Sequence, residues 1–469
     1  MKIQQIYTGC LAQGAYYIES NGEAAIIDPL RETKTYVEKA TENNVHIKYV
    51  FETHFHADFV SGHLDLAKAT GATIVFGPDA TTDYEMYSAK DGEEFSIGNI
   101  KIKVLHTPGH TLESTTYLLI DENGKEHAIF SGDTLFLGDV GRPDLAIKSD
   151  LTKEDLAGML FDSLRTKIMP LPDDVIVYPA HGAGSACGKN LSKETVGILG
   201  EQKQTNYALR ADMTKEEFIK EVLDGITPPP QYFSKNALLN KVGYTAFETV
   251  LEKGDIPLTP ERFEALANEE SALVLDVRNR KDFLNEHIPN SIFIGLDGSF
   301  APWVGALIAD LQQPILLVVP KGKSAEAITR LSRVGYDNTL GYLEGGLKAW
   351  KKSGRETATI HSISAEEFAK RLKKSKLNVL DVRKDGEYKA KHMEGAQHFA
   401  LDYIDKNMNE VDANKAYHIH CAGGYRSVIA ASILKARGFH KVTDVAGGFK
   451  HIKETDIPLT EFVCPSTLS

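Results

Sequence analysis

The second half of the sequence contains two copies of one pattern, and this repeat limits the fold class more than any other feature. LVLDVRNRKDFLNEHIPNS at 273–291 corresponds to NVLDVRKDGEYKAKHMEGA at 378–396, with the two Asp-Val-Arg triplets 105 residues apart. In each copy, short apolar runs bounded by turn residues alternate with helical stretches, which is typical of an α/β domain with a mostly parallel sheet. Two copies of about 100 residues predict two domains of one fold, because solenoid repeats are shorter and more numerous.

The first half of the chain mixes strand-like and helix-like segments without such a repeat. It runs into ITPPPQYFSKN at 226–236, whose three consecutive prolines predict a stiff, extended connector. We therefore expect an α/β multidomain chain with boundaries near 245–258 and 356–361. The predicted domains are 1–250, 258–356 and 360–469.

Charge and composition narrow the partners and the compartment. The formal charge of −12 at pH 7 argues against nucleic acid or an anionic membrane surface, because both require a basic face. We find no apolar stretch approaching the roughly 20 residues of a spanning helix, and no secretory signal. The 4 cysteines form no CxxC pair, which favours a reducing, cytoplasmic environment.

Metal-capable side chains follow four separate strand-like runs, in the segments THFHAD, HTPGH, FSGDTLF and VYPAHG. Strand ends of this kind can converge on one rim of a sheet sandwich, where neutral imidazoles and a carboxylate bind a divalent metal. One isolated histidine would be a satisfied core or surface residue, whereas four such junctions together predict a metal site. The candidates are His54, His56, Asp58, His106, His110, Asp133 and His181.

These motifs resemble the metallo-β-lactamase superfamily, which implies an αββα sandwich over roughly the first half of the chain. In dinuclear members the motif His-x-His-x-Asp-His gives its last histidine to a second metal, but Phe59 stands at that position here. The loss of this donor makes a two-metal hydrolase less favourable and leaves His54, His110 and Asp133 as a set for mononuclear non-haem Fe(II) that also binds O2. The persulfide dioxygenase branch, which shares GDTLFLGDVGRPDL at 132–145, uses this set.

The resemblance gives the surrounding residues supporting roles. They would orient the ligands or a metal-bound water: His56, Asp58, His181, Arg142 and Asp144. Cys187, in PAHGAGSACGKN at 179–190, would bind or relay sulfur, with a buried structural cysteine as the alternative. One Zn²⁺ in the same pocket is the alternative metal. Connector residues that could reach the pocket are Tyr232, Asn236 and Asn240.

The last repeat carries a cysteine loop, CAGGYRS, between a strand and a helix. Unpaired backbone N–H groups and the helix dipole at such a place favour a thiolate, and Arg426 adds positive charge near Cys421. The spacing resembles the rhodanese sulfurtransferases, which implies that Cys421 carries sulfur as a persulfide. The loop around it consists of Ala422, Gly423, Gly424, Tyr425, Arg426 and Ser427.

The earlier repeat lacks this nucleophile. A gap-free alignment through the loop sets Val318 against Cys421 and Lys323 against Arg426. The middle domain therefore resembles a degenerate rhodanese that spaces the active domains or meets a second subunit, and we expect a homo-oligomer.

The whole chain resembles a persulfide dioxygenase–rhodanese fusion of sulfide oxidation. The implied activity is oxidation of a small thiol persulfide, of glutathione, coenzyme A or a similar thiol, to sulfite and thiol. Cys421 would exchange sulfane sulfur with the same thiols and, with sulfite, give thiosulfate. Two alternatives stay open: a zinc-dependent thioesterase of the glyoxalase II kind fused to a sulfurtransferase, and a non-enzymatic sulfur carrier or sulfide sensor.

Overall fold

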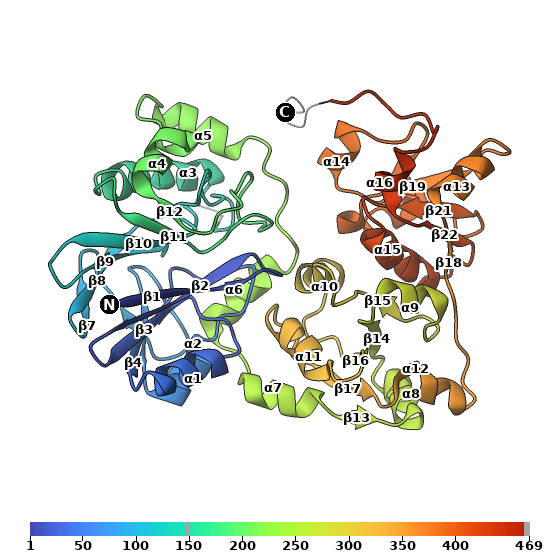
Figure 1. Ribbon diagram of the computed structural model, residues 1–469, viewed down its shortest axis with the longest axis horizontal. Helices are drawn as coiled ribbons and strands as arrows, with labels where there is room; N and C mark the ends of the chain where they lie inside the picture. The colour runs from blue at the N-terminus through green and yellow to red at the C-terminus, as the bar shows by residue number, and fades with distance from the viewer. Residues whose placement is uncertain (147–150, 464–469) are drawn as a thin grey trace. The chain divides into compact units, whose positions relative to one another are not determined.

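The computed structural model describes residues 1–146 and 151–463. The chain divides into two compact units, the first of which comprises Met1–Thr249 together with Leu331–Gly335. The second unit holds Val250–Arg330 and the chain from Tyr336 onward. Figure 1 follows the chain from blue to red through both units.

The first unit contains two six-stranded sheets (Figure 1). The first has the order β1-β2-β3-β4-β5-β6 and is built from β1 Lys2–Thr8, β2 Gln13–Ser20, β3 Glu23–Ile27, β4 His46–Phe51, β5 Thr73–Phe76 and β6 Tyr87–Ser88. The second has the order β12-β11-β10-β9-β8-β7 and is built from β7 Glu94–Ile97, β8 Ile100–His106, β9 Thr115–Ile120, β10 Glu126–Gly132, β11 Ile176–Pro179 and β12 Gly197–Ile198.

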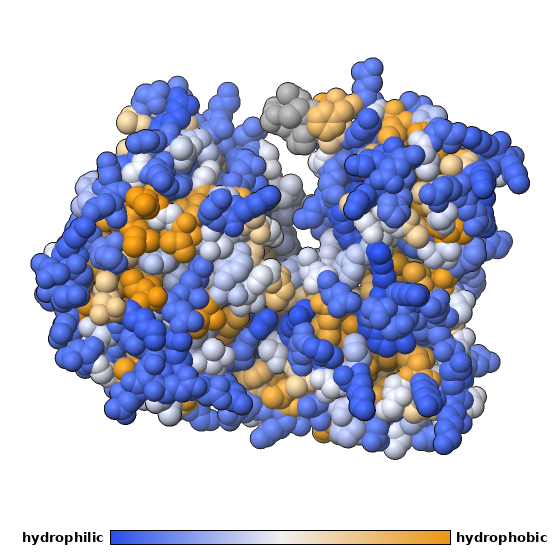
Figure 2. All heavy atoms as spheres, viewed as in Figure 1, coloured by the Kyte–Doolittle hydropathy of each residue, from blue (hydrophilic) through white to orange (hydrophobic). Residues whose placement is uncertain are grey.

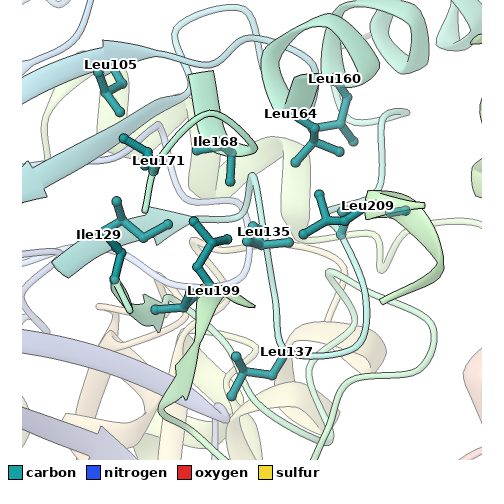
Figure 3. Packing of buried hydrophobic residues seen from close by; sticks show 14 of the residues in the cluster. Leu105, Ile129, Leu135, Leu137, Leu160, Leu164, Ile168, Leu171, Leu199 and Leu209 are labelled. Atoms are coloured by element: carbon teal, nitrogen blue, oxygen red, sulfur yellow. The ribbon is translucent and has the colours of Figure 1, made fainter. Parts of the chain in front are cut away.

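Alternating side chains fill three apolar layers of this unit. In β2, Tyr16 and Ile18 join the cluster shared by the two sheets, whereas Tyr17 joins the cluster formed with Tyr36 and Leu66 of the covering helices. This two-residue period is the expected property of a strand buried on both faces. Figure 3 shows leucine and isoleucine side chains of the third layer packed together. The predicted αββα sandwich is confirmed.

Two helices of the first unit begin at clear side-chain caps. Thr152 and Thr214 each accept a hydrogen bond from the backbone three residues on and form capping boxes, which define the starts of α3 and α5. The connector predicted to be extended becomes helical from Phe233, and a helix also occupies the predicted boundary 245–258. The helices are α1 Lys34–Glu42, α2 His63–Thr70, α3 Lys153–Ser163, α4 Leu199–Thr205, α5 Lys215–Leu223 and α6 Phe233–Val242, with α7 Phe247–Gly254 divided between the two units.

The second unit contains two five-stranded, all-parallel sheets with one connectivity, β13-β17-β16-β14-β15 and β18-β22-β21-β19-β20. The first uses β13 Pro257–Leu258, β14 Leu273–Asp276, β15 Ile292–Phe293, β16 Ile315–Val318 and β17 Thr339–Leu343, with α8 Pro260–Glu269, α9 Arg280–Asn285, α10 Phe300–Leu307, α11 Ser324–Ser332 and α12 Gly346–Lys352. The second uses β18 His361–Ile363, β19 Asn378–Asp381, β20 Gln397–His398, β21 Tyr417–His420 and β22 Val442–Val445, with α13 Ala365–Leu372, α14 Asp385–Ala390, α15 Tyr425–Ala436 and α16 Gly448–Ile452. The repeat therefore corresponds to two copies of one fold.

The surface is mostly hydrophilic on the face shown in Figure 2, with apolar side chains in separate patches. Among the described residues, we find no helix with the length and apolarity needed to cross a bilayer.

Candidate metal centre and cysteine loop

The predicted metal ligands come together in the first unit, at the ends of β4, β8, β10 and β11. Each of these strands packs side chains into the core, and the donors follow shortly after its end. The sheet therefore fixes their positions, rather than a mobile loop. All of them are at least 95% buried: His54, His56, Asp58, His110, Asp133 and His181. His106, on the same junction as His110, turns away and hydrogen-bonds the carbonyl of Leu112.

His54, His110 and Asp133 form one set of donors that fits a single ion. Asp133 Oδ2 lies 3.3 Å from His110 Nε2 and 3.9 Å from His54 Nε2. All three donor atoms lie within 4.8 Å of one another. Because metal–ligand distances are about 2.0–2.2 Å, donors at this separation can share one ion.

A second set lies beside the first. The donors of His56, Asp58 and His181 also fall within 4.8 Å of one another, and His181 Nε2 is 3.5 Å from Asp58 Oδ2. Asp133 and His181 also form a set with Cys187. The Phe59 ring packs 4.3 Å from the His56 ring, centroid to centroid, and offers no donor atom.

Hydrogen bonds fix the ring orientation of three histidines. His110 Nδ1 donates to the carbonyl of Arg142 at 2.9 Å, and His181 Nδ1 lies 3.3 Å from the carbonyl of Ala12. His54 Nδ1 lies 3.0 Å from Thr53 Oγ1, which itself donates to Asp28. With Nδ1 engaged in each ring, Nε2 is the free donor, which is how histidines are prepared for metal binding.

The buried polar atoms of the centre match a bound cation. Both carboxylate oxygens of Asp133, Asp58 Oδ1 and His181 Nε2 have no hydrogen-bond partner among the described residues. A buried carboxylate without a partner is costly, and a cation removes that cost. Burial and the neighbouring imidazoles hold the pKa of His54 well below its usual value, which keeps the ring neutral as a ligand must be. Burial raises the pKa of Asp58.

The His56 ring also faces two carboxylates outside these donor sets, those of Asp28 and Glu52. Its Nε2 lies 3.0 Å from Asp28 Oδ1 and 3.5 Å from Glu52 Oε2. Burial alone would lower the pKa of His56, but Asp28 and Glu52 outweigh it and raise that pKa to about 9. This imidazole is therefore paired with buried acids behind the centre.

Arg142 ties the centre to the segment that carries Cys187. Its guanidinium makes two hydrogen bonds to Asp144, at 2.7 and 2.8 Å, and also donates to the carbonyls of Ala186 and Thr227. Cys187 is 1% exposed, and burial together with Asp133 and Asp58 raises the pKa of its thiol well above the usual value. Cys187 is thus a protonated thiol beside the donors.

A pocket of about 470 Å³ opens next to the centre. Its walls are mostly apolar, with Glu113, Asp144 and Lys241 as charged groups, and helix α6 supplies one side through Phe233 and its neighbours. A pocket of this size takes a small molecule rather than a polymer. The α6 residues that line it do not include Asn236 or Asn240. Asn240 instead donates to the carbonyls of His56 and Phe59, both at 2.8 Å.

The cysteine loop lies in the second unit, where β21 ends and α15 begins. The backbone N–H of Gly424 donates to Cys421 Sγ at 3.0 Å, and Gly424 has φ +94°. Ser427 Oγ lies 3.7 Å from the same sulfur and donates to Asp444 at 2.6 Å. A backbone N–H donor of this kind at a helix start stabilises negative charge on sulfur.

The positive charge of Arg426 is paired with a carboxylate as well as lying near the thiol. Its guanidinium makes two hydrogen bonds to Glu387 of α14, at 2.6 and 2.8 Å. Burial opposes ionisation of Glu387, but the bonds from Arg426 prevail and lower its pKa. The positive charge that the sequence assigned to Cys421 is therefore largely neutralised.

Strand pairing corrects the alignment of the middle domain. Asp276 pairs with Val318, and the equivalent Asp381 pairs with His420, so Val318 corresponds to His420. The gap-free alignment is wrong by one position: Val319 stands where Cys421 stands. In the same register Lys323 corresponds to Tyr425, and Ser324 to Arg426. The middle domain still has no nucleophile at this place.

Comparison with known proteins supports this architecture. Residues 8–181 match the metallo-β-lactamase superfamily, and residues 259–353 and 364–455 each match the rhodanese-like domain. A solved structure, the metallo-β-lactamase from Staphylococcus aureus subsp. aureus COL, is 33% identical with a TM-score of 0.64, and the match covers 73% of this chain and 98% of that one.

Two curated relatives match the first unit. A probable hydroxyacylglutathione hydrolase of Schizosaccharomyces pombe is 31% identical over 160 residues, which covers 34% of this chain and 58% of the relative. A cytoplasmic hydroxyacylglutathione hydrolase of Arabidopsis thaliana is 30% identical over 186 residues, which covers 39% and 67%. The chain spans only 58–60% of the length of the first curated relatives it matches.

Proposed function

The chain belongs to the metallo-β-lactamase superfamily and continues into two rhodanese-like domains, and on this premise we propose that it is a persulfide dioxygenase joined to a sulfurtransferase. The proposed reaction of the first unit is R–S–SH + O2 + H2O → R–SH + SO3²⁻ + 2 H⁺. The terminal sulfur is oxidised, O2 is reduced, and the S–S bond breaks. The thiol R–SH is released when the S–S bond of the persulfide breaks.

The observation that carries this proposal is the donor set His54, His110 and Asp133. Two imidazoles and one carboxylate leave coordination positions open, which suits non-haem Fe(II). When bound, Fe(II) would supply the redox chemistry with O2. Phe59 offers no donor atom beside it, which supports one ion rather than two.

The residues of the chain position the reactants. The carbonyl of Arg142 fixes the His110 ring, and the adjacent pocket excludes bulk water from the tail of the persulfide. Its Lys241 and Glu113 fit the carboxylate and ammonium groups of a thiol such as glutathione, or the polar groups of coenzyme A. Asp58, His181 and Asp144 keep the supporting roles proposed for them. The thiol of Cys187 lies within 4.8 Å of the donors of Asp133 and His181, which supports a contact with the substrate sulfur.

In the last domain Cys421 takes and passes sulfane sulfur. With thiosulfate as donor the step is Cys–S⁻ + S2O3²⁻ → Cys–S–S⁻ + SO3²⁻, and its reverse consumes sulfite from the first unit. The N–H of Gly424 donates to the sulfur that carries the charge, and Ser427, whose hydroxyl donates to Asp444, lies beside it.

A metal analysis combined with an oxygen electrode tests the first unit. We expect about one iron per chain and O2 uptake with glutathione persulfide, both lost in His110→Ala. His46→Ala, an exposed histidine at the start of β4, is the matched control and should keep both. Full activity in His110→Ala would refute the assignment.

A zinc thioesterase is the second candidate, because the donors of His56, Asp58 and His181 also converge and the curated relatives are named hydroxyacylglutathione hydrolases. It requires zinc in the purified protein, hydrolysis of a glutathione thioester and no O2 uptake. A mere sulfur carrier would instead accept one sulfur on Cys421 and show no turnover.

A further inference from the structure

One peptide unit in the cysteine loop is held at both ends. The N–H of Gly424 donates to Cys421 Sγ at 3.0 Å, and the carbonyl of the same peptide, on Gly423, accepts a hydrogen bond of 2.6 Å from Arg280 Nη1. Arg280 is the first residue of α9 and belongs to the domain that lacks a nucleophile. Both domains lie in the same compact unit.

This peptide joins two glycines, so little resists its rotation. Gly424 already has φ +94°, and Gly423 has no side chain to restrict it. A half-turn would replace the N–H donor at Cys421 with a carbonyl oxygen, which repels a thiolate or persulfide. Arg280 stabilises only the observed orientation and not the flipped one, because a guanidinium only donates hydrogen bonds and stays charged at every relevant pH.

The guanidinium also strengthens the donor. A charge on the carbonyl end of a peptide polarises its N–H, and hydrogen bonds in a chain reinforce one another. Arg426 is less able to do this, because Glu387 accepts two hydrogen bonds from it.

The middle domain contacts the next residue of the loop as well. The hydroxyl of Tyr425 donates to the carbonyl of Gly295 at 2.7 Å. A Cβ on Gly298 would stand 2.3 Å from Tyr425 Cζ, so the two segments are in close contact there. The loop is therefore fixed from the neighbouring domain at two successive places.

We propose that Arg280 is a positioning residue for sulfur transfer, acting through the Gly423–Gly424 peptide to keep its N–H on Cys421 Sγ. The degenerate domain thereby completes the active loop of its neighbour. This inference rests on the proposed role of Cys421 as the sulfur carrier.

The test uses the full chain with Arg280→Ala, Arg280→Lys and the control Lys281→Ala, which removes an exposed charge from the same helix. Labelling of Cys421 by iodoacetamide is followed against pH by peptide mass spectrometry, beside sulfur transfer from thiosulfate to cyanide. We expect about a tenfold loss of both rates at neutral pH in Arg280→Ala, and a labelling profile displaced to higher pH. Arg280→Lys should recover part of the loss, and Lys281→Ala should match the wild type.

The other charged groups near the sulfur are unchanged in these variants: Arg426, Glu387, Asp444, His420 and Asp381. A loosened domain contact would reduce kcat without displacing the labelling profile, and that result would overturn the proposal. An unchanged rate and profile in Arg280→Ala would overturn it too. If wild-type Cys421 labels normally but never transfers sulfur, the proposed function fails instead, while a displaced profile would still support the role of Arg280.

Discussion

The two rhodanese-like domains have one backbone plan and different chemistry. Each contains a buried aspartate that accepts hydrogen bonds from an arginine two residues later, Asp276 from Arg278 and Asp381 from Arg383. Each also has a glycine with positive φ just before the helix that follows the central strand, Gly322 and Gly424. These shared features are what the fold needs.

The differences are confined to the loop and its surroundings. Val319 replaces Cys421, and Lys321 replaces Gly423. The peptide between Gly423 and Gly424 carries the N–H that donates to Cys421 Sγ. Val318 stands where His420 lies 3.8 Å from Asp381. The comparison separates residues that keep the sheet together from residues proposed to handle sulfur.

The largest effect is expected from the nucleophile itself. Cys421→Ser should reduce sulfur transfer at least about 100-fold, because a hydroxyl does not form the persulfide. The double variant Cys421→Ser with Val319→Cys should stay inactive, since Lys321 and Ser324 do not reproduce Gly423 and Arg426. A thiocyanate assay measures both, with Val319→Cys alone as control. Recovery of transfer in the double variant would show that the two loops are equivalent after all.

A matched pair of glycines sharpens the comparison. Gly448 and Gly346 both have φ +58°, but a Cβ on Gly448 would stand 2.3 Å from the carbonyl oxygen of Cys421, whereas Gly346 has nothing within 4 Å. Gly448→Ala should therefore lower the free energy of unfolding by about 3 kcal/mol and impair transfer. Gly346→Ala should cost about 1 kcal/mol from backbone strain alone. Urea denaturation of the two variants checks this, and equal losses would contradict it.

The smallest expected effect is on how the stability of the two domains depends on acidic pH. Burial raises the pKa of Asp381, but His420 and Arg383 outweigh it, so that pKa lies below its usual value. For Asp276 burial prevails over Arg278, and the pKa is raised. The Asp381 contribution to stability is present above the unfolded pKa of about 3.9 and is lost as pH falls through the lower folded pKa. Asp276 acts in reverse, adding stability as pH falls through its raised folded pKa toward the unfolded value.

Stability against pH in Asp381→Asn and Asp276→Asn measures this difference. Asp381→Asn should reduce the loss of unfolding free energy that occurs as pH falls below about 4. Asp276→Asn should reduce the gain of unfolding free energy that occurs as pH falls toward about 4 from above. Each change should be about 1 kcal/mol or less. The same pH dependence in both variants would show that the two buried aspartates are equivalent.

The sequence was sufficient to predict the parts of the molecule that depend on local pattern. Histidines and aspartates directly after apolar runs had to lie at strand ends, and the sheet then brought His54, His110 and Asp133 together. The Cys421 loop followed from a strand, a glycine pair and a helix in succession.

Contacts between distant segments could not be predicted in this way. The middle domain is longer than the last between its first two central strands, which shifted the alignment at Val318. The pairing of Arg426 with Glu387 and the approach of Arg280 to Gly423 join residues 39 and 143 positions apart. Neither leaves a periodic signal along the chain.

Asn240 has a consequence for the length of chain that the candidate metal centre needs. Its side chain bonds the backbone of His56, Phe59 and Ser61, three groups inside the segment that bears the ligands. A polypeptide stopped at residue 181, where the superfamily match ends, would leave these buried groups without partners. We therefore expect a fragment that runs through α6, which ends at Val242, to hold the ligand-bearing segment better than one that stops where the superfamily match ends.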